Sequence, residues 1–237
     1  MTAVESLPLR ETVSGLAECG VVAFTTTRAA GDYGLGDATP PPENLARWHA
    51  LQQEFAVVAP RFASARQVHG TTILELGDGV ARWTRADGAD GHVSFIRGAG
   101  CAVTVADCVP VFVAHPSGAI AMLHAGWRGT AAGILAKGVE RLRAAGLQPA
   151  DLRLHLGPAI CGRCYTVGPD VFEQLTGWAT TRARNVDLRA LLAEQAKEAG
   201  VTKVTVSAYC TRCDNDRFFS HRAGDAGRQL SVVVAPS

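Results

Sequence analysis

Hydrophobic residues along this chain gather in short runs bounded by glycine and proline, a pattern that predicts many β-strands. The densest such region is 101–125, where three apolar runs are separated by only a few turn residues. We expect these runs to be adjacent strands that are buried on both faces. Further strands are predicted at 20–27, at 66–76 as strand, turn and strand around Gly70, and at 152–156, 201–208 and 230–234.

Three segments repeat apolar residues at the spacing of a helix face and are predicted to be helices. They lie near Glu43–Phe55, from Gly126 to about Ala145, and at Asp187–Ala199, where Asp187 is placed to cap the helix N-terminus. A glycine- and proline-rich loop is expected at 29–42. The chain shows no internal repeat and no linker, so one mixed α/β domain over residues 1–237 is predicted.

Composition narrows the range of partners. The 237 residues are 47% hydrophobic and carry a formal net charge of +1, which gives no basic footprint for nucleic acid or for an anionic membrane face. No apolar run approaches the roughly 18 residues that a membrane span requires. Residues 1–10 lack the charged start and apolar run of a secretory signal. We therefore expect a cytoplasmic protein whose seven cysteines serve as thiols, metal ligands or catalytic groups.

Three potential metal ligands, His69, Cys108 and His124, end predicted strands, and each is closely followed by glycine or proline. A rigid sheet can fix the direction of such side chains while the loops beyond them stay open to a substrate. Two imidazoles and one thiolate suit a borderline-soft cation such as zinc, and three protein ligands leave a fourth position vacant. The pattern predicts a catalytic zinc site at one rim of a sheet.

The same residues are open to two other interpretations. A buried cysteine and two hydrogen-bonded core histidines would fit these positions, because cysteine is among the residues most often buried. Alternatively, Cys108 and His124 form a nucleophile–base pair without a metal. That pair needs a third group to orient the histidine, and Asp107 faces away from Cys108 if the strand alternates regularly.

Three blocks of the sequence stand out together: 67–70 (QVHG), 104–110 (TVADCVP) and 124–130 (HAGWRGT). They resemble the signature blocks of the bacterial laccase-domain family, known both as multicopper polyphenol oxidases and as zinc-dependent purine nucleoside phosphorylases. Further matching blocks are 26–28, 156–160, 164–168, 210–211, 218–222 and 227–229. These blocks run in family order across nearly the whole sequence.

The resemblance implies a layered sandwich of mixed β-sheets flanked by helices. It implies phosphorolysis of adenosine, inosine, guanosine and methylthioadenosine to the free base and ribose 1-phosphate, with adenosine deamination as a side activity. His69, Cys108 and His124 fall on the family's metal ligands, with zinc as the expected ion and copper as the alternative. A homodimer is also implied.

Candidates for the remaining roles follow from their chemistry. Arg128, in the segment that opens the helix after Gly126, is expected to bind phosphate beside the metal, unless it pairs with a structural carboxylate. His221 is expected to protonate the departing base, with a solvated loop histidine as the alternative. Cys108 and His124 would act in catalysis through the metal. Candidates for binding the substrate are Arg28, Gln67, Tyr165, Phe219 and Arg222.

Two Cys-x-x-Cys units, Cys161–Cys164 and Cys210–Cys213, could together form a second, four-thiolate zinc site. The long segment between them favours reduced thiols near the pocket instead. Cys19 and Cys101 are expected to be small buried hydrophobes.

Two rival activities remain. Copper-dependent phenol oxidation would need many clustered histidines, and the seven present include no His-x-His pair. Hydrolysis of peptidoglycan precursors would use the same Cys and His residues with a different pocket.

Overall fold

The computed structural model describes residues 8–36, 39–77, 79 and 83–237. The strands of the first sheet are β1 (Arg10–Thr12), β2 (Val22–Thr26), β3 (Arg61–Arg66), β5 (Trp83–Asp87), β7 (Ala99–Val105) and β14 (Gln229–Ala235). Those of the second are β4 (Ile73–Glu75), β6 (Gly91–Ser94), β8 (Val109–Ala114), β9 (Ile120–Ala125), β10 (Arg153–Leu156) and β13 (Lys203–Val206). A separate two-stranded sheet pairs β11 (Thr166–Val167) with β12 (Arg184–Asn185).

The helices are α1 (Pro42–Phe55), α2 (Trp127–Ala131), α3 (Ile134–Ala144), α4 (Pro169–Thr176) and α5 (Leu188–Glu198). Short 3-10 helices occupy η1 (Ser14–Cys19), η2 (Arg28–Ala30), η3 (Pro149–Asp151) and η4 (His221–Ala223). None of the helices in the described part of the chain is long and apolar enough to cross a bilayer.

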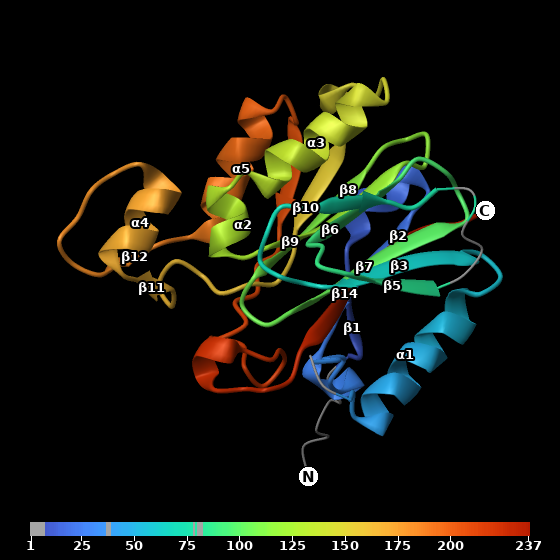
Figure 1. The fold of residues 1–237 in the computed structure, drawn as a ribbon, viewed down its shortest axis with the longest axis horizontal. Helices are drawn as coiled ribbons and strands as arrows, with labels where there is room; N and C mark the ends of the chain where they lie inside the picture. The colour runs from blue at the N-terminus through green and yellow to red at the C-terminus, as the bar shows by residue number, and fades with distance from the viewer. Residues whose placement is uncertain (1–7, 37–38, 78, 80–82) are drawn as a thin grey trace, which may run out of the picture.

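The two six-stranded sheets pack face to face, with α1 on the outer side of the first and α3 and α5 on the outer side of the second (Figure 1). Strand order is β1-β2-β14-β7-β3-β5 in the first sheet and β13-β10-β8-β9-β6-β4 in the second. Both sheets mix parallel and antiparallel pairs. The predicted mixed α/β sandwich is confirmed.

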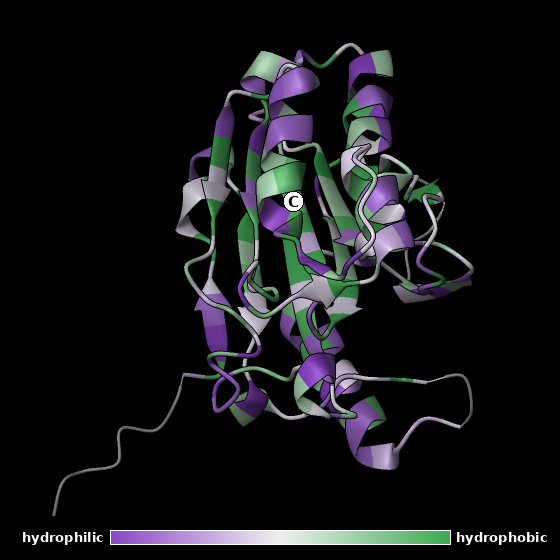
Figure 2. Cartoon of the chain, turned by 90° about the vertical axis from the view of Figure 1, so that its left-hand side faces the viewer, coloured by the Kyte–Doolittle hydropathy of each residue, from purple (hydrophilic) through white to green (hydrophobic). Residues whose placement is uncertain are grey.

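Alternating residues of the central strands supply three apolar layers. On β9, Ile120 and Met122 face the first sheet, whereas Leu123 packs beneath the helices of the second. On β14, Val233 faces the second sheet while Val232 contacts the layer under α1. Because successive side chains of a strand point to opposite faces, continuous apolar runs fit strands covered on both sides. Figure 2 shows this as hydrophobic strands between helices whose outward faces are hydrophilic.

The strands predicted at 20–27, 152–156 and 230–234 and the helices at Glu43–Phe55 and Asp187–Ala199 are confirmed, with slightly different bounds. Asp187 caps α5 as expected, since its carboxylate accepts hydrogen bonds from the Arg189 and Ala190 N–H groups. The strand predicted at 201–208 is shorter, as β13. Residues 37 and 38 of the predicted loop 29–42 lie outside the described residues.

Three predictions were wrong in ways that matter for the site. The runs within 101–125 are not all neighbours, because β7 belongs to the first sheet and β8 and β9 to the second. The helix expected from Gly126 to about Ala145 is two helices, separated at Gly133, which has φ 75. Within 66–76 the strand expected before Gly70 is absent, because β3 ends at Arg66 and residues 67–72 form a loop, whereas the strand expected after Gly70 is present as β4. Strands β5 and β6 and helix α4 were not predicted.

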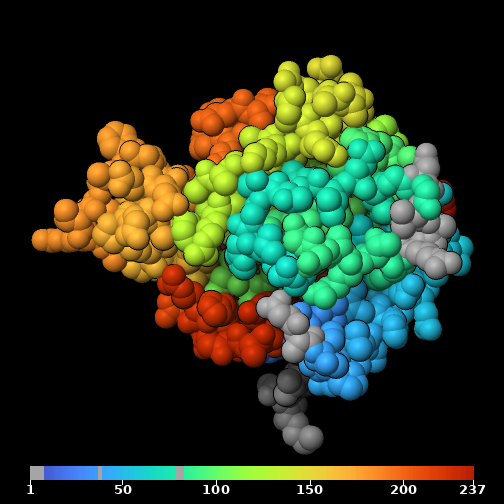
Figure 3. Space-filling view, in the orientation of Figure 1, coloured from blue at the N-terminus to red at the C-terminus, as the bar shows by residue number. Residues whose placement is uncertain are grey.

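Helix α4 and the β11–β12 ladder form a lobe that projects from one side of the molecule (Figures 1 and 3). The segment before this lobe contains Tyr165, and the segment after it leads into α5. The lobe is therefore anchored at both ends to parts of the chain that approach the site described below.

Gly100 of β7 provides a test of how tightly the first sheet is packed. A Cβ atom at this position would lie 2.5 Å from Cδ2 of Phe62, whose ring stacks on Trp83 at 3.8 Å. We expect Gly100→Ala to lower the free energy of unfolding by about 1–3 kcal/mol, because the ring must move within a packed layer. Urea denaturation measures the change. Gly15→Ala, whose Cβ would meet only ordinary contacts from 3.5 Å, is the control, and an equal effect from both would contradict this account.

Candidate metal centre and pocket

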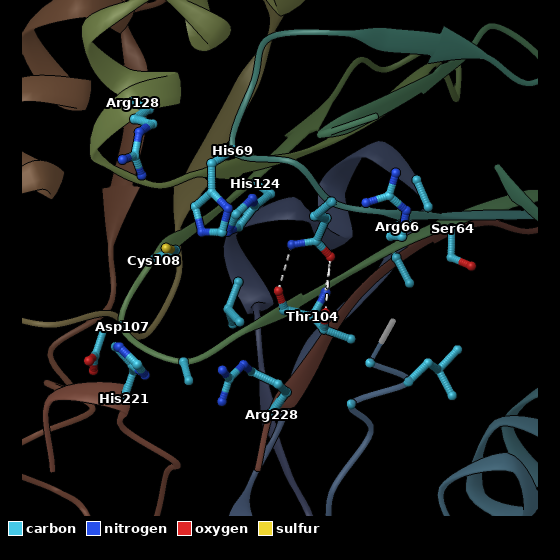
Figure 4. A pocket seen from close by; sticks show the side chains of 18 of the residues that line it. Ser64, Arg66, His69, Thr104, Asp107, Cys108, His124, Arg128, His221 and Arg228 are labelled. Carbon is cyan, nitrogen blue, oxygen red and sulfur yellow. Dashed lines mark hydrogen bonds between the residues drawn. The ribbon is translucent and has the colours of Figure 1, made fainter. Parts of the chain in front are cut away.

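His69, Cys108 and His124 are far apart in sequence, but their ligand atoms all lie within 4.8 Å of one another (Figure 4). His69 lies in the loop that follows β3 of the first sheet, and His124 belongs to β9 of the second. Cys108 lies in the turn through which the chain passes from β7 to β8. The cluster therefore forms at the seam between the two sheets.

The turn that presents Cys108 has an unusual backbone. Asp107 adopts φ 83, a region that L-residues rarely occupy. Its carboxylate accepts hydrogen bonds from the Thr211 hydroxyl at 2.6 Å and from the Arg222 N–H at 2.7 Å, and its carbonyl accepts one from the Ile160 N–H at 3.1 Å. These bonds hold a conformation that costs energy by itself. The sulfur of Cys108 is thus aimed by a turn, not by a regular strand end as the sequence suggested.

His69 is held in a similar way. It also has a positive φ, 59, and its loop wraps around the carboxylate of Asp90. That carboxylate accepts hydrogen bonds from three successive backbone N–H groups: Val68 at 3.3 Å, His69 at 2.9 Å and Gly70 at 2.6 Å. Successive N–H groups that converge on one anion form a nest, so a fixed negative charge stabilises this loop shape.

The same carboxylate orients the second histidine. Asp90 is fully buried and lies 2.9 Å from Nδ1 of His124, and the His124 N–H donates to the Asp90 carbonyl at 2.7 Å. A hydrogen bond from Nδ1 leaves Nε2 as the atom that can bind an ion. Burial favours the neutral carboxyl, but the bonds from His124 and Gly70 lower the pKa of Asp90. One ionised side chain therefore positions two of the three ligands.

The cluster shifts the pKa of its own members. Desolvation alone would raise the pKa of Cys108, but the adjacent His124 and His69 imidazoles lower it to about 6. Burial disfavours protonated His124, but Cys108 and Asp90 raise its pKa to about 9. Cys108 is therefore held as a thiolate at neutral pH, which is the form that ligates metal.

The donor set and its spacing fit a zinc ion with three protein ligands. Gly126 supports this interpretation, because a Cβ there would lie 3.0 Å from the Cys108 sulfur and 3.1 Å from Cδ2 of His69. Only glycine lets the backbone approach the cluster this closely. His124 also donates a hydrogen bond to a carboxylate, as metal-bound histidines generally do.

A pocket of about 560 Å³ opens beside the cluster. This volume lies within the range of small-molecule sites. Besides the three candidate ligands, the predicted residues Gln67, Arg128, Tyr165, His221 and Arg222 line it. Three arginines that the sequence did not single out, Arg66, Arg85 and Arg228, also line it, together with an apolar portion at Leu35, Trp48 and Ala102. The walls are therefore markedly cationic.

Of the substrate-binding candidates, Gln67 lines the pocket, but its amide is largely occupied. It donates to the Thr104 carbonyl at 2.8 Å and accepts from the Thr104 N–H at 2.8 Å and hydroxyl at 3.1 Å (dashed in Figure 4). Its structural contribution is to fasten the loop that carries His69 to β7. We infer that Gln67 positions the pocket wall more than it reads a substrate.

Arg28 and Phe219 are not among the residues that line the pocket. The Arg28 guanidinium lies 4.5 Å over the Phe219 ring and pairs with Asp225 at 2.7 Å. It also donates to the carbonyls of Asn215 and Phe218. The two residues are thus engaged with each other and with the segment 215–225, outside the pocket lining, and their contact with substrate stays a prediction.

Tyr165, His221 and Arg222 lie together on the side of the pocket near Asp107. The Arg222 guanidinium lies 4.8 Å over the Tyr165 ring and donates to the Thr166 carbonyl at 3.0 Å. Burial raises the pKa of Tyr165, so its hydroxyl stays protonated. Because Arg222 covers the ring, Tyr165 offers a substrate its hydroxyl more readily than a stacking face.

Arg128 extends from α2 and is exposed at the pocket edge, with its guanidinium 4.4 Å over the Trp127 ring. Helix α2 is only 5 residues long, so its dipole adds little to anion binding there. Any phosphate bound there would therefore be held mainly by side chains such as Arg128, and not by the dipole of a long helix.

Asp90 is the main residue that the sequence analysis missed. It stands in the segment Ala89-Asp-Gly91, where an acidic residue beside glycine is typical of a turn. Only its distance from His124 in space distinguishes it from a turn residue. The four cysteines of the Cys-x-x-Cys units, expected to be thiols near the pocket, instead converge on one another.

Comparisons with known proteins agree with this geometry. Residues 35–236 match the family model described as multi-copper polyphenol oxidoreductase laccase. A Mycobacterium tuberculosis protein named purine nucleoside phosphorylase is 35% identical over 226 residues, covering 88% of this chain and 90% of that protein. A Deinococcus radiodurans protein of the same name is 34% identical, covering 90% and 88%. The crystal structure of Bacillus licheniformis hypothetical protein YfiH superposes with a TM-score of 0.86 at 26% identity, covering 98% and 97%.

Asp90→Asn tests the anchoring role of this carboxylate. An amide has the size of the carboxylate but not its charge. Its NH₂ group cannot accept hydrogen bonds from the backbone N–H groups that converge there. We expect the free energy of unfolding to fall by about 3 kcal/mol, as when one member of a buried charged network is removed. Urea denaturation with a chelator present measures this without any metal contribution.

The control is Asp87→Asn, whose carboxylate bonds Arg66 but whose side chain is 80% exposed. Loss of that solvent-exposed pair should change the free energy of unfolding far less than Asp90→Asn does. Equal effects from the two substitutions would show that Asp90 is no special anchor.

Proposed function

The chain belongs to the multi-copper polyphenol oxidoreductase laccase family, which includes its relatives named purine nucleoside phosphorylase, and we propose that it is itself a zinc-dependent purine nucleoside phosphorylase. The observation that carries this proposal is a His69–Cys108–His124 cluster in the wall of a cationic pocket. Adenosine, inosine, guanosine and methylthioadenosine are the proposed nucleosides, with adenosine deamination as a side activity.

A zinc ion held by His69, Cys108 and His124 would supply a Lewis acid at the pocket wall. The chain's own contribution is to fix these donors before the ion binds. Asp90 holds one histidine ring and the loop of the other, and the Asp107 turn holds the thiolate. Such preorganisation reduces the cost of assembling a charged site.

Phosphate is proposed to bind between Arg128 and Arg222. Both guanidinium groups line the pocket beside the metal cluster, and an arginine can hold two oxygens of one phosphate. Neither side chain has an acidic partner among the ion pairs of the described residues. Their positive charge is thus available to an anion.

In phosphorolysis, a phosphate oxygen forms a bond to the ribose C1′ while the bond from C1′ to the purine nitrogen breaks. The electrons of the broken bond leave with the purine, which must gain a proton. His221 lines the pocket beside Arg222 and is proposed to donate that proton from its imidazole. The Tyr165 hydroxyl, protonated at neutral pH, is a further hydrogen-bond donor on the same wall.

Oxidation by several copper ions finds less support. The ligand clusters of the described residues include only His69 and His124 among the seven histidines. A blue-copper site and a copper cluster would need more imidazoles than these two. Hydrolysis of peptidoglycan precursors through Cys108 is distinguished by experiment, because such an enzyme would not convert adenosine and phosphate into adenine and ribose 1-phosphate.

The central test is incubation of zinc-loaded protein with adenosine and phosphate, with chromatography for adenine and ribose 1-phosphate. We expect both products, with ribose 1-phosphate equal in amount to adenine plus any hypoxanthine that follows from deamination. His69→Ala and Cys108→Ala should each lower the rate by more than about 100-fold, since both remove a metal ligand. His49→Ala, on the exposed side of α1 and outside the pocket, is the histidine control and should keep full activity.

Other outcomes of this assay would reject the proposal. Adenine released without phosphate would indicate a hydrolase, and inosine alone would indicate a deaminase. Oxygen consumption with a phenol that appears only after copper loading would indicate an oxidase.

Arg128→Gln tests the phosphate site. Loss of a charge-assisted bidentate bond is expected to raise the KM for phosphate by about 10- to 100-fold, with a smaller effect on the KM for adenosine. Arg141→Gln is the control, because Arg141 pairs with Glu75 on the exposed side of α3 and does not line this pocket. A rise in the KM for adenosine alone would place the phosphate elsewhere.

A further inference from the structure

The two Cys-x-x-Cys units converge on one point of the structure although residues 165–209 separate them. The sulfurs of Cys161, Cys164, Cys210 and Cys213 all lie within 4.8 Å of one another, and all four cysteines are free. We propose that they hold a second zinc ion, in a four-thiolate site separate from the His69–Cys108–His124 cluster.

The spacing of the sulfurs fits a tetrahedral ion. Zinc–sulfur bonds of about 2.3 Å place the sulfurs of a tetrahedron about 3.8 Å apart. The Cys164 and Cys213 sulfurs are 3.4 Å apart, and no pair in the group exceeds 4.8 Å. A disulfide would need about 2.05 Å. The four sulfurs are thus gathered at a distance suited to a shared ion.

The backbone around the sulfurs is arranged as metal-bound thiolates require. The N–H groups of Cys161 and Cys213 both point at the Cys210 sulfur, at 3.2 Å and 3.4 Å. Each unit also closes a tight turn, through the bond from the Cys164 N–H to the Cys161 carbonyl and from the Asp214 N–H to the Cys210 carbonyl. Donors aimed at a sulfur stabilise its ionised form.

The positive charges near the four cysteines also favour a zinc ion with four thiolate ligands. Zinc with four thiolates carries a net negative charge, and each Cys-x-x-Cys unit has an arginine directly before its second cysteine, Arg163 and Arg212. The Arg212 guanidinium donates to the Cys164 carbonyl at 3.3 Å, so it lies over the opposite unit. These cations offset the charge that four clustered thiolates would build up.

The position of the site suggests what the ion does. Cys164 immediately precedes Tyr165 of the pocket, and Cys210 is bridged to Ala159 and followed by Thr211, which bonds Asp107. An ion here would cross-link the segment that reaches the pocket at Tyr165 to the segment that holds the Asp107 turn through Thr211. We infer a structural role, since four protein thiolates leave no position for substrate.

Metal content tests the proposal, which goes beyond the phosphorolysis proposal and does not depend on it. Elemental analysis of protein made in zinc-containing medium should give two zinc ions per chain. His69→Ala should retain one of them, and Cys164→Ser with Cys213→Ser should also retain one. All three substitutions together should retain none. Cys19→Ala, a buried cysteine outside both clusters, is the matched control and should retain two.

A second measurement uses the unaltered chain, so that a misfolded variant cannot decide the outcome. After replacement of zinc by cobalt, thiolate-to-cobalt absorption should have the intensity of five thiolates per chain, four from this site and one from Cys108. A single zinc that disappears with His69→Ala would overturn the proposal. So would rapid alkylation of Cys161, Cys164 and Cys213 in the native zinc-loaded protein.

Discussion

The site depends on one buried negative charge. Asp90 precedes β6 of the second sheet, yet it binds the backbone of a loop that leaves the first sheet and also the ring of His124. A carboxylate without solvent contact is tolerated only when its oxygens are fully hydrogen-bonded. The bonds that satisfy this requirement are the same bonds that bring His69 and His124 together. Stability of the buried charge and assembly of the ligand cluster are therefore a single constraint.

The sequence could predict the ligands but not what holds them. His69, Cys108 and His124 could be singled out because their donor types suit one ion and because family blocks surround them. Asp90 carries no local pattern that separates it from a turn residue. The division of 101–125 between two sheets was also hidden, since a strand buried on both faces has the same apolar run in either sheet. The role of Asp90 and the sheet to which each strand belongs are both set by contacts between residues far apart in the sequence.

The arginines show the same limit of sequence-based prediction, because their ion-pair partners are visible only in the folded structure. The sequence offers Arg128 as a phosphate ligand and Arg28 as a substrate-binding candidate, but it does not show that Arg28 pairs with Asp225 while Arg128 lines the pocket. Nor does it show that the Phe219 ring lies under Arg28. The cysteines show the opposite error. Distance along the chain argued against a shared site, but the parallel bridge between Ala159 and Cys210 removes that distance in the folded structure.

The three candidate ligands come from both layers of the sandwich and from the turn that joins them. An ion bound by all three would cross-link the two layers, in addition to the apolar contacts and the Asp90 hydrogen bonds that join them. The unfolded chain could not reproduce this arrangement. Each bound ion then shifts the folding equilibrium by an amount set by its free concentration. When the metal is scarce, the chain without its ion would unfold more often and would be degraded sooner.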